Sequence, residues 1–297
     1  MRTQGTEETG RAPDAGTPPS GAARTTAQTT ALAEPPTMDR LAPLTPNAWL
    51  RFDLLRRMIP PTVADVLEIG CGQGALGVRL AARYRYLGLE PDAESFAVAR
   101  QRIALGGRGE VRNVTVEALD PQERFDLVCA FEVLEHIEDD AGALKTWAGR
   151  LRPGGSLLLS VPAHQSRYAA ADELVGHYRR YDAEPLEALL RGAGFAEVEL
   201  REYGMPLGYL LEAGRNAVGR RRLAAAPSAS MEQRTGTSGR LLQPRSALQG
   251  AAARWGTAPF RYVQRGFPHT GTGLVARAKL PNASRGAAAV SPSGSAR

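Results

Sequence analysis

The sequence predicts an α/β protein whose mostly parallel sheet is covered by helices on both faces. Three observations point to this class: short apolar runs typical of buried strands, segments with apolar residues at helical spacing, and a regular alternation of the two between residues 63 and 204. Strands and helices that alternate are joined by right-handed crossovers, which make the strands parallel and divide the helices between the two faces.

The expected strands are short and rich in apolar residues. "VADVLEI", "FDLVCAFE" and "SLLLSVPA" are nearly continuous apolar runs, as in strands that are buried on both faces. "VRNVTVEA" instead alternates between apolar and polar residues, as in a half-buried strand. The seven expected strands cover residues 63–69, 84–90, 111–118, 125–132, 156–163, 196–203 and 272–280.

Four helices are expected between these strands. Asp92 is a good N-cap for the second helix, "RPGG" ends the third, and a glycine stop ends the fourth. The expected helices cover residues 74–84, 92–104, 139–151 and 183–194. In such a sheet, ligands bind beyond the carboxyl ends of the strands, where the first strand meets "EIGCGQG".

One domain is expected over residues 45–280, between disordered tails at 1–40 and 281–297. The N-terminal tail has hardly a bulky apolar residue, so it cannot bury enough surface to offset the entropy of ordering. The N-terminus lacks the apolar core of a signal peptide, and no run approaches the roughly 18 apolar residues that a spanning helix needs. We therefore expect a cytoplasmic protein without a transmembrane segment.

Basic residues are concentrated in the last third of the chain. Residues 204–297 hold 14 basic and 2 acidic side chains, whereas residues 1–203 hold 23 basic and 29 acidic ones. Such an asymmetry is found in proteins that bind a nucleic acid, a membrane surface or an anionic substrate. The alternative is an arginine-rich but merely solvated surface, because the whole chain has only two lysines.

The stretch "VLEIGCGQG" at 66–74 carries the main functional signal. A strand that leads through a glycine-rich turn into a helix presents free backbone N–H groups and the positive end of the helix dipole. Glu90 ends the second strand 20 residues after Gly70, where a carboxylate can accept both ribose hydroxyls of a nucleoside. NAD fits this much as well, since Gly70, Gly72 and Ala75 satisfy the pattern G-x-G-x-x-A.

Glu68 distinguishes between NAD and the other candidate cofactor. It lies two residues before the first glycine, where its carboxylate would repel a pyrophosphate. S-adenosylmethionine (SAM) has an adenosine, a cationic amino group and a sulfonium, but no phosphate. The loop therefore favours SAM over NAD.

Five segments in register resemble the class I SAM-dependent methyltransferases, and are most similar to the branch related to ubiquinone-biosynthesis O-methyltransferases. They are "VLEIGCGQG", "YLGLEPD", "RFDLVCAFEVLEHIED", "LRPGGSLLLSVPA" and "GHYRRYDAEPLEALLRGAGF". The resemblance covers about residues 45–205 and the strand at 272–280. It implies a Rossmann-like, seven-stranded, mostly parallel sheet whose last strand is antiparallel and follows a basic insertion.

The resemblance also implies roles for single residues. Glu68 matches the acid that orients the methionine part of SAM, Glu90 matches the ribose-binding acid, and Glu132 follows the fourth strand beside the methionine end. The implied cofactor-binding residues are Glu68, Gly70, Cys71, Gly72, Gly74, Glu90, Pro91, Phe131 and Glu132. Two alternatives stay open: Glu90 could cap a helix, and Cys71 could be only a small apolar filler.

The expected reaction is a direct displacement that moves the methyl group to a hydroxyl of a small-molecule acceptor, so positioning supplies much of the rate. A general base helps to activate a hydroxyl with a pKa around 10, and the candidate catalytic residues are His164 and His177, after the fifth strand. The alternative is that His177 and Arg180 form a structural hydrogen-bonded knot. No cluster of metal ligands stands out, so no metal is expected, and "EVLEH" (132–136) is assigned to a turn.

Residues 204–270 form a long connection between two strands, and connections of this length are usually functional or disordered. They include "PLGYLLEAGRNAVGRRRL", expected as a basic amphipathic helix at 206–223. We expect this insertion to cover the acceptor site, or to dock on an anionic surface or partner. RNA or protein acceptors and a NAD-dependent oxidoreductase remain the alternative functions, and the oligomeric state stays open.

Overall fold

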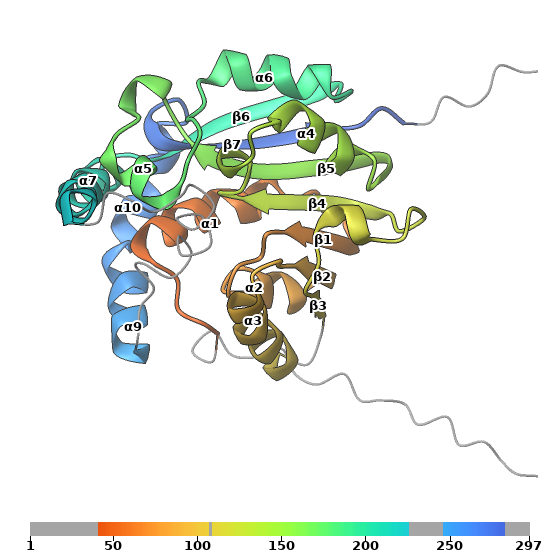
Figure 1. Cartoon of the computed structure of the whole chain (residues 1–297), viewed down its shortest axis with the longest axis horizontal. Coiled ribbons are helices and arrows are strands. Elements are labelled where there is room, and N and C mark those ends of the chain that lie inside the picture. The colour runs from red at the N-terminus through yellow and green to blue at the C-terminus, as the bar shows by residue number, and fades with distance from the viewer. Residues whose placement is uncertain (1–40, 107–108, 226–245, 283–297) are drawn as a thin grey trace, which may run out of the picture. The chain divides into compact units, whose positions relative to one another are not determined.

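The computed structural model of the chain describes residues 41–106, 109–225 and 246–282. In these residues, seven strands form one sheet with the order β3-β2-β1-β4-β5-β7-β6 (Figure 1). The strands are β1 (Asp65–Ile69), β2 (Arg85–Leu89), β3 (Glu110–Arg112), β4 (Phe125–Phe131), β5 (Leu151–Pro162), β6 (Glu197–Gly204) and β7 (Gly271–Lys279).

Strand directions confirm the predicted fold class. β1 pairs in parallel with β2 and β4, and the parallel pairing continues to β3 on one side and to β5 on the other. β7 inserts between β5 and β6 and runs antiparallel to both. The last strand is thus the antiparallel one, as the sequence predicted, and its buried run of apolar residues suits a place inside the sheet.

Helices cover both faces of the sheet, because successive strand residues point to opposite sides. Leu67 and Val128 pack on the face of α4 and α6, whereas Val66 and Leu127 pack on the face of α1, α2 and α3. The helices are α1 (Pro46–Met58), α2 (Gly77–Ala81), α3 (Ala93–Leu105), α4 (Asp140–Ala148), α5 (Ala170–Val175), α6 (Ala183–Gly192), α7 (Leu207–Ala225), α9 (Ala247–Gly256) and α10 (Ala258–Val263).

Two expected elements are shorter than predicted. The strand expected at 111–118 stops at Arg112 and is followed by a 3-10 turn at Val116–Ala118. The Asn113 side chain donates to the carbonyls of Glu90 and Pro91, which turns the chain away from the sheet. The helix expected at 74–84 is reduced to α2, because Gly74 takes the left-handed conformation with φ +73°.

α1 was not predicted, although its start carries a recognisable signal. Thr45 is the N-cap and accepts the Ala48 N–H at 3.2 Å, and Pro46 occupies the first helical position. α1 also anchors the end of the insertion, since the Gln264 side chain donates to the Leu50 carbonyl at 2.9 Å.

The helices of the insertion lie near the carboxyl ends of the parallel strands. α7 confirms the helix expected at 206–223, and it packs against α5. In Figure 1, α5, α7, α9 and α10 gather on the left, the side toward which the parallel strands β1, β4 and β5 point. This is the edge where a ligand is expected to bind.

The expected tails, 1–40 and 281–297, lie outside the described residues except for Pro281 and Asn282. Among the residues that the structure describes, no helix is both long and apolar enough to cross a membrane.

Candidate active site

The glycine loop follows β1 and is built from three left-handed residues. Gly70, Gly72 and Gly74 have φ values of +66°, +54° and +73°, a region that side chains with a Cβ rarely adopt. A Cβ on Gly70 would lie 2.8 Å from Val133 Cγ2, whereas a Cβ on Gly72 would meet nothing within 4 Å. The loop is thus packed at Gly70 and borders open space at Gly72, as a cradle for a ligand would.

Glu90 ties the end of β2 to this loop. Its carboxylate accepts the Gly72 N–H at 2.7 Å and the Asp92 N–H at 2.9 Å, and the side chain is buried. Asp92 caps α3 by accepting the Ser95 N–H at 2.9 Å. The helix cap is therefore Asp92, and Glu90 lies beside the cradle where the sequence placed it.

Glu68 lies under the loop in a buried position. Tyr86 donates its hydroxyl to Glu68 Oε2 at 2.6 Å, and burial raises the pKa of Glu68 to about 7. Cys71 is buried nearby, and burial raises the pKa of its thiol well above the ordinary value. A protonated, buried thiol is a small apolar filler rather than a nucleophile.

Glu132, just after β4, holds an unusual backbone conformation. Its φ of 57° is left-handed, which is uncommon for a residue with a side chain and is often found at functional sites. Glu132 Oε1 lies 3.0 Å from Arg51 Nη1 and accepts the Ser160 hydroxyl at 2.9 Å. Burial would raise the pKa of Glu132, but Arg51 and Ser160 outweigh it and lower that pKa, so the carboxylate is ionised.

One unexpected residue and two of the expected cofactor residues need comment. Arg51, on α1, was missed by the sequence analysis because it lies 81 positions from its partner Glu132 and outside every recognised segment. Phe131 packs within the hydrophobic core, and Pro91 is exposed beside Asn113. Both lie at strand ends near the loop, but neither shares the contacts of Glu68, Glu90 and Glu132.

The two candidate catalytic histidines belong to different networks. His164 follows β5 with a left-handed φ of 63°, and its Nε2 lies 3.3 Å from Glu202 Oε2. His177 follows α5, and its Nδ1 lies 2.8 Å from Asp172 Oδ1. His164 is 35% exposed, whereas His177 is only 12% exposed.

A buried ion network joins the segment after β5 to α7. Arg180 donates from Nε and Nη2 to the Asp172 carboxylate at 2.8–3.0 Å and from Nη1 to Glu212. Arg167 also donates to Glu212. His177 and Arg180 therefore do share Asp172, so the structural knot considered for this pair is present.

SAM fits these residues better than a dinucleotide does. Glu68, Glu90 and Glu132 stand at or near the carboxyl ends of the adjacent strands β1, β2 and β4. Carboxylates gathered at one edge favour a cationic ligand and oppose a pyrophosphate. The open side of Gly72 leaves room for a group to approach the backbone.

A surface depression at the opposite edge is unrelated to this site. It encloses about 660 Å³ and lies at the amino ends of the parallel strands. Its charged residues pair with one another, as in Arg277 Nη2 with Glu199 Oε2 at 2.8 Å. Neither the glycine loop nor Glu68, Glu90 or Glu132 lines this depression.

The fold and the loop together define a cofactor-binding α/β enzyme. Residues 45–200 match the family described as "Methyltransferase domain". The match spans more than half of the chain, so the chain belongs to this family, a class that uses SAM. The family predicted from the sequence is thereby confirmed.

Two similar proteins are named as methyltransferases, but each matches this chain over only part of its length. A ubiquinone biosynthesis O-methyltransferase of Bradyrhizobium sp. is 39% identical over 100 residues, which cover 32% of this chain and 39% of that protein. A probable S-adenosylmethionine-dependent methyltransferase of Mycobacterium tuberculosis is 33% identical over 160 residues, covering 52% of this chain and 58% of that one. The chain thus spans less than two thirds of the length of either relative.

Solved structures show the same fold at low sequence identity. The YcgJ protein of Bacillus subtilis is 15% identical with a TM-score of 0.53, covering 80% of this chain and 99% of that one. The [4+2]-cyclase SpnF is 21% identical with a TM-score of 0.51, covering 78% and 80% of the two chains. Because a cyclase shares the fold, the fold alone does not decide the reaction.

Proposed function

We propose that the protein transfers the methyl group of SAM to a hydroxyl of a small-molecule acceptor. The observation that carries this proposal is the clamp of Glu90 on Gly72 beside an open cradle, together with the buried Glu68 beneath it. The cofactor, when bound, supplies an electrophilic methyl group on a sulfonium. The O-methyltransferase relative supports a hydroxyl as the acceptor.

The chain's own residues would divide the binding work. Glu90 would accept the ribose hydroxyls, and the backbone around Gly72 would contact the cofactor closely because no Cβ intervenes. Glu132 would provide negative charge near the cationic end, and Glu68 would add to it as the pH rises through its pKa of about 7. Arg51 and Ser160 hold the Glu132 carboxylate in place, so its charge is fixed before the ligand arrives.

His164 is the better general base of the two histidines. It is partly exposed at the carboxyl end of β5, so an acceptor can reach it, and Glu202 at 3.3 Å can orient its ring. His177 is more enclosed, and its Nδ1 is engaged by Asp172. The displacement also requires the acceptor oxygen to be aligned with the methyl group. We expect the segment that carries His164 to help position the acceptor.

The insertion is proposed to cover the acceptor side. α7 reaches the segment that carries both histidines through Glu212, which is buried and paired with Arg180 and Arg167. Gly219 makes this contact close, since a Cβ there would lie 2.8 Å from the Ala170 backbone. Arg220–Arg222 of the same helix are exposed, and their positive charge would also suit an anionic substrate or surface as a further partner.

Two assays test the proposal. Thermal shift with SAM, S-adenosylhomocysteine and NADH should show stabilisation by the first two, whereas stabilisation by NADH alone would replace the proposal with an oxidoreductase. Labelled-methyl transfer from SAM should then be measured to phenols, quinols and sugars, with RNA and protein in parallel. Transfer to a hydroxyl of a small molecule supports the proposal, and transfer only to RNA or protein contradicts it.

A further inference from the structure

Glu135 is a buried carboxyl group whose two oxygens have no hydrogen-bond partner. The residue is 0% exposed, in the 3-10 turn Leu134–His136 that follows β4. Its backbone carbonyl, unlike its side chain, is hydrogen-bonded, since it accepts the Tyr178 N–H at 2.8 Å. A buried charge without a partner is costly, so a group in this position calls for a proton or a cation.

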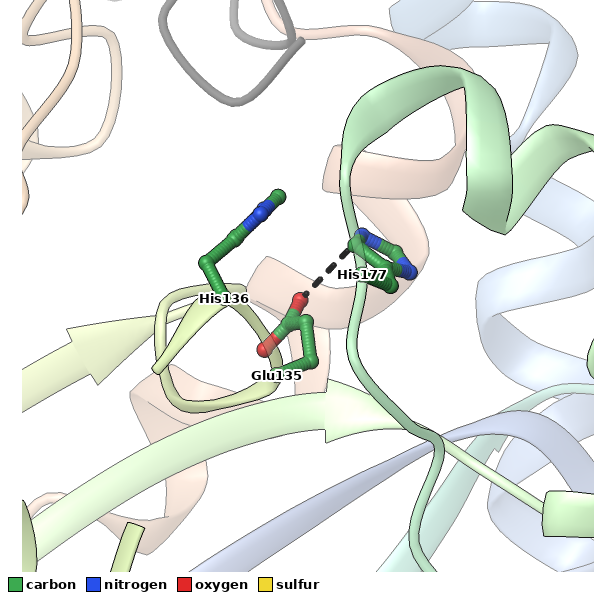
Figure 2. A group of neighbouring side chains, drawn as sticks. All are labelled: Glu135, His136 and His177. Carbon is green, nitrogen blue, oxygen red and sulfur yellow. Dashed lines mark ion pairs between the residues drawn. The ribbon is translucent and has the colours of Figure 1, made fainter. Parts of the chain in front are cut away.

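His177 faces this carboxyl group with its Nε2 nitrogen. Asp172 binds Arg180 as well as His177, so it is a carboxylate and can only accept a hydrogen bond. His177 Nδ1 therefore carries a proton. His177 Nε2, the nitrogen that Asp172 does not engage, lies 3.8 Å from Glu135 Oε1 (Figure 2).

His136 completes the group from the neighbouring position in the chain. Its Nδ1 lies 3.1 Å from the Gly176 carbonyl oxygen, which can only accept, so Nδ1 is again the protonated nitrogen. The rings of His136 and His177 meet edge to face with centroids 4.7 Å apart. Histidines whose second nitrogen donates to a carboxylate or carbonyl are the usual form of metal-binding histidines.

The three side chains offer ligand atoms that all lie within 4.8 Å of one another (Figure 2). Around a tetrahedral ion with bonds of about 2.0–2.1 Å, ligand atoms lie about 3.4 Å apart. Binding one ion therefore requires the three ligand atoms to move closer together. The sequence analysis expected no metal because "EVLEH" and His177 are 41 positions apart at their nearest, and only the fold brings them together.

We propose that Glu135, His136 and His177 bind one divalent transition-metal ion. Two imidazoles and one carboxylate favour Zn²⁺ or Co²⁺ over Mg²⁺, which prefers oxygen ligands. Three protein ligands leave a coordination position open. The site lies between the end of β4 and the segment that carries His164, so an acceptor hydroxyl in the open position would have a lowered pKa; this last step rests on the proposed function.

Metal binding is tested on the full chain after treatment with a chelator, without SAM or acceptor. Calorimetry with Co²⁺ and Zn²⁺ should show one ion per chain, with the visible absorption of bound Co²⁺, and weaker binding of Mg²⁺. Glu135→Gln should lower the Co²⁺ affinity by about 100-fold or more, since even outer partners of metal ligands contribute 10- to 100-fold. His269→Ala, at an exposed histidine outside the cluster, should bind as the wild type does.

Circular dichroism shows whether Glu135→Gln folds, and His177→Asn is the second variant if it does not. The site is refuted if the wild-type chain takes up no Co²⁺, or if Glu135→Gln and His269→Ala bind it equally. The catalytic step is refuted separately if the chelated enzyme keeps full methyl transfer. Conversely, stoichiometric Co²⁺ binding without methyl transfer to any hydroxyl would support the site and contradict the proposed function alone.

Discussion

The Glu90 carboxylate accepts the Gly72 N–H at 2.7 Å, so the acidic end of β2 holds the glycine loop that follows β1. The same carboxylate accepts the Asp92 N–H at 2.9 Å and thereby links the loop to the start of α3. One side chain thus shapes the cradle and is proposed to bind the ribose. The two roles can be separated by measuring folding and cofactor affinity on the same variants.

Glu90→Ala should lower SAM affinity by about 10- to 1000-fold, because hydrogen bonds to a charged acceptor contribute roughly 1.5–3 kcal/mol each. Calorimetric titration with SAM measures the loss, and urea denaturation measures the accompanying change in stability. Glu187→Gln, at a partly exposed glutamate on α6 that pairs with Arg191, is the control and should leave SAM affinity unchanged. Wild-type SAM affinity in Glu90→Ala would remove this residue from the site.

Replacing glycines should separate packing from ligand access. Gly72→Ala places a Cβ in open space at φ +54°, so we expect about 1–2 kcal/mol of strain and a clear loss of SAM affinity. Gly70→Ala adds a clash with Val133 at 2.8 Å and should destabilise the fold more. In the Gly70→Ala background, Val133→Ala should recover part of that stability. Unchanged SAM affinity in Gly72→Ala would argue that the ligand does not approach the loop there.

Glu68 should make stability depend on pH. Burial raises its folded-state pKa from 4.5 to about 7, so the folded chain keeps a proton that the unfolded chain has lost. The stabilisation is therefore complete below pH 4.5 and is lost as the pH rises through about 7. Glu68→Gln should gain up to about 3 kcal/mol relative to the wild type across this window. Urea denaturation of both proteins at several pH values measures it, and a constant difference would contradict the buried titration.

Glu212→Gln should loosen α7 from the acceptor-side segment. Removing one partner of a buried ion pair is strongly destabilising, and since Arg180 keeps Asp172 we expect about 2–3 kcal/mol. If α7 covers the acceptor, the KM for the acceptor should rise while SAM affinity stays the same. An unchanged KM together with the loss of stability would leave Glu212 a purely structural role.

His164→Asn should reduce kcat by about 100- to 10 000-fold, the usual contribution of a general base. SAM affinity should not change, since His164 contacts Glu202 rather than the glycine loop. Full activity in His164→Asn would remove this residue as the general base.

Much of the fold was predictable because its signals are local. Apolar periodicity placed the seven strands in sequence, and the interval from Gly70 to Glu90 placed an acid beside the loop. The end of β3 was mispredicted because Asn113 diverts the chain through side-chain hydrogen bonds that periodicity does not reveal. α1 was missed because its N-cap signal stood outside the recognised pattern.

By itself, the sequence determined the order of strands and helices, the glycine loop and the acids that belong to it. These follow from backbone periodicity, from the torsions open to glycine and from short spacings along the chain. Only the tertiary structure decided that Arg51 reaches Glu132, that Glu212 reaches Arg180, and that His177 faces Glu135. These pairs are distant in sequence and meet only because the strand order brings the carboxyl ends of β4 and β5 together at one edge, beside α1 and the insertion.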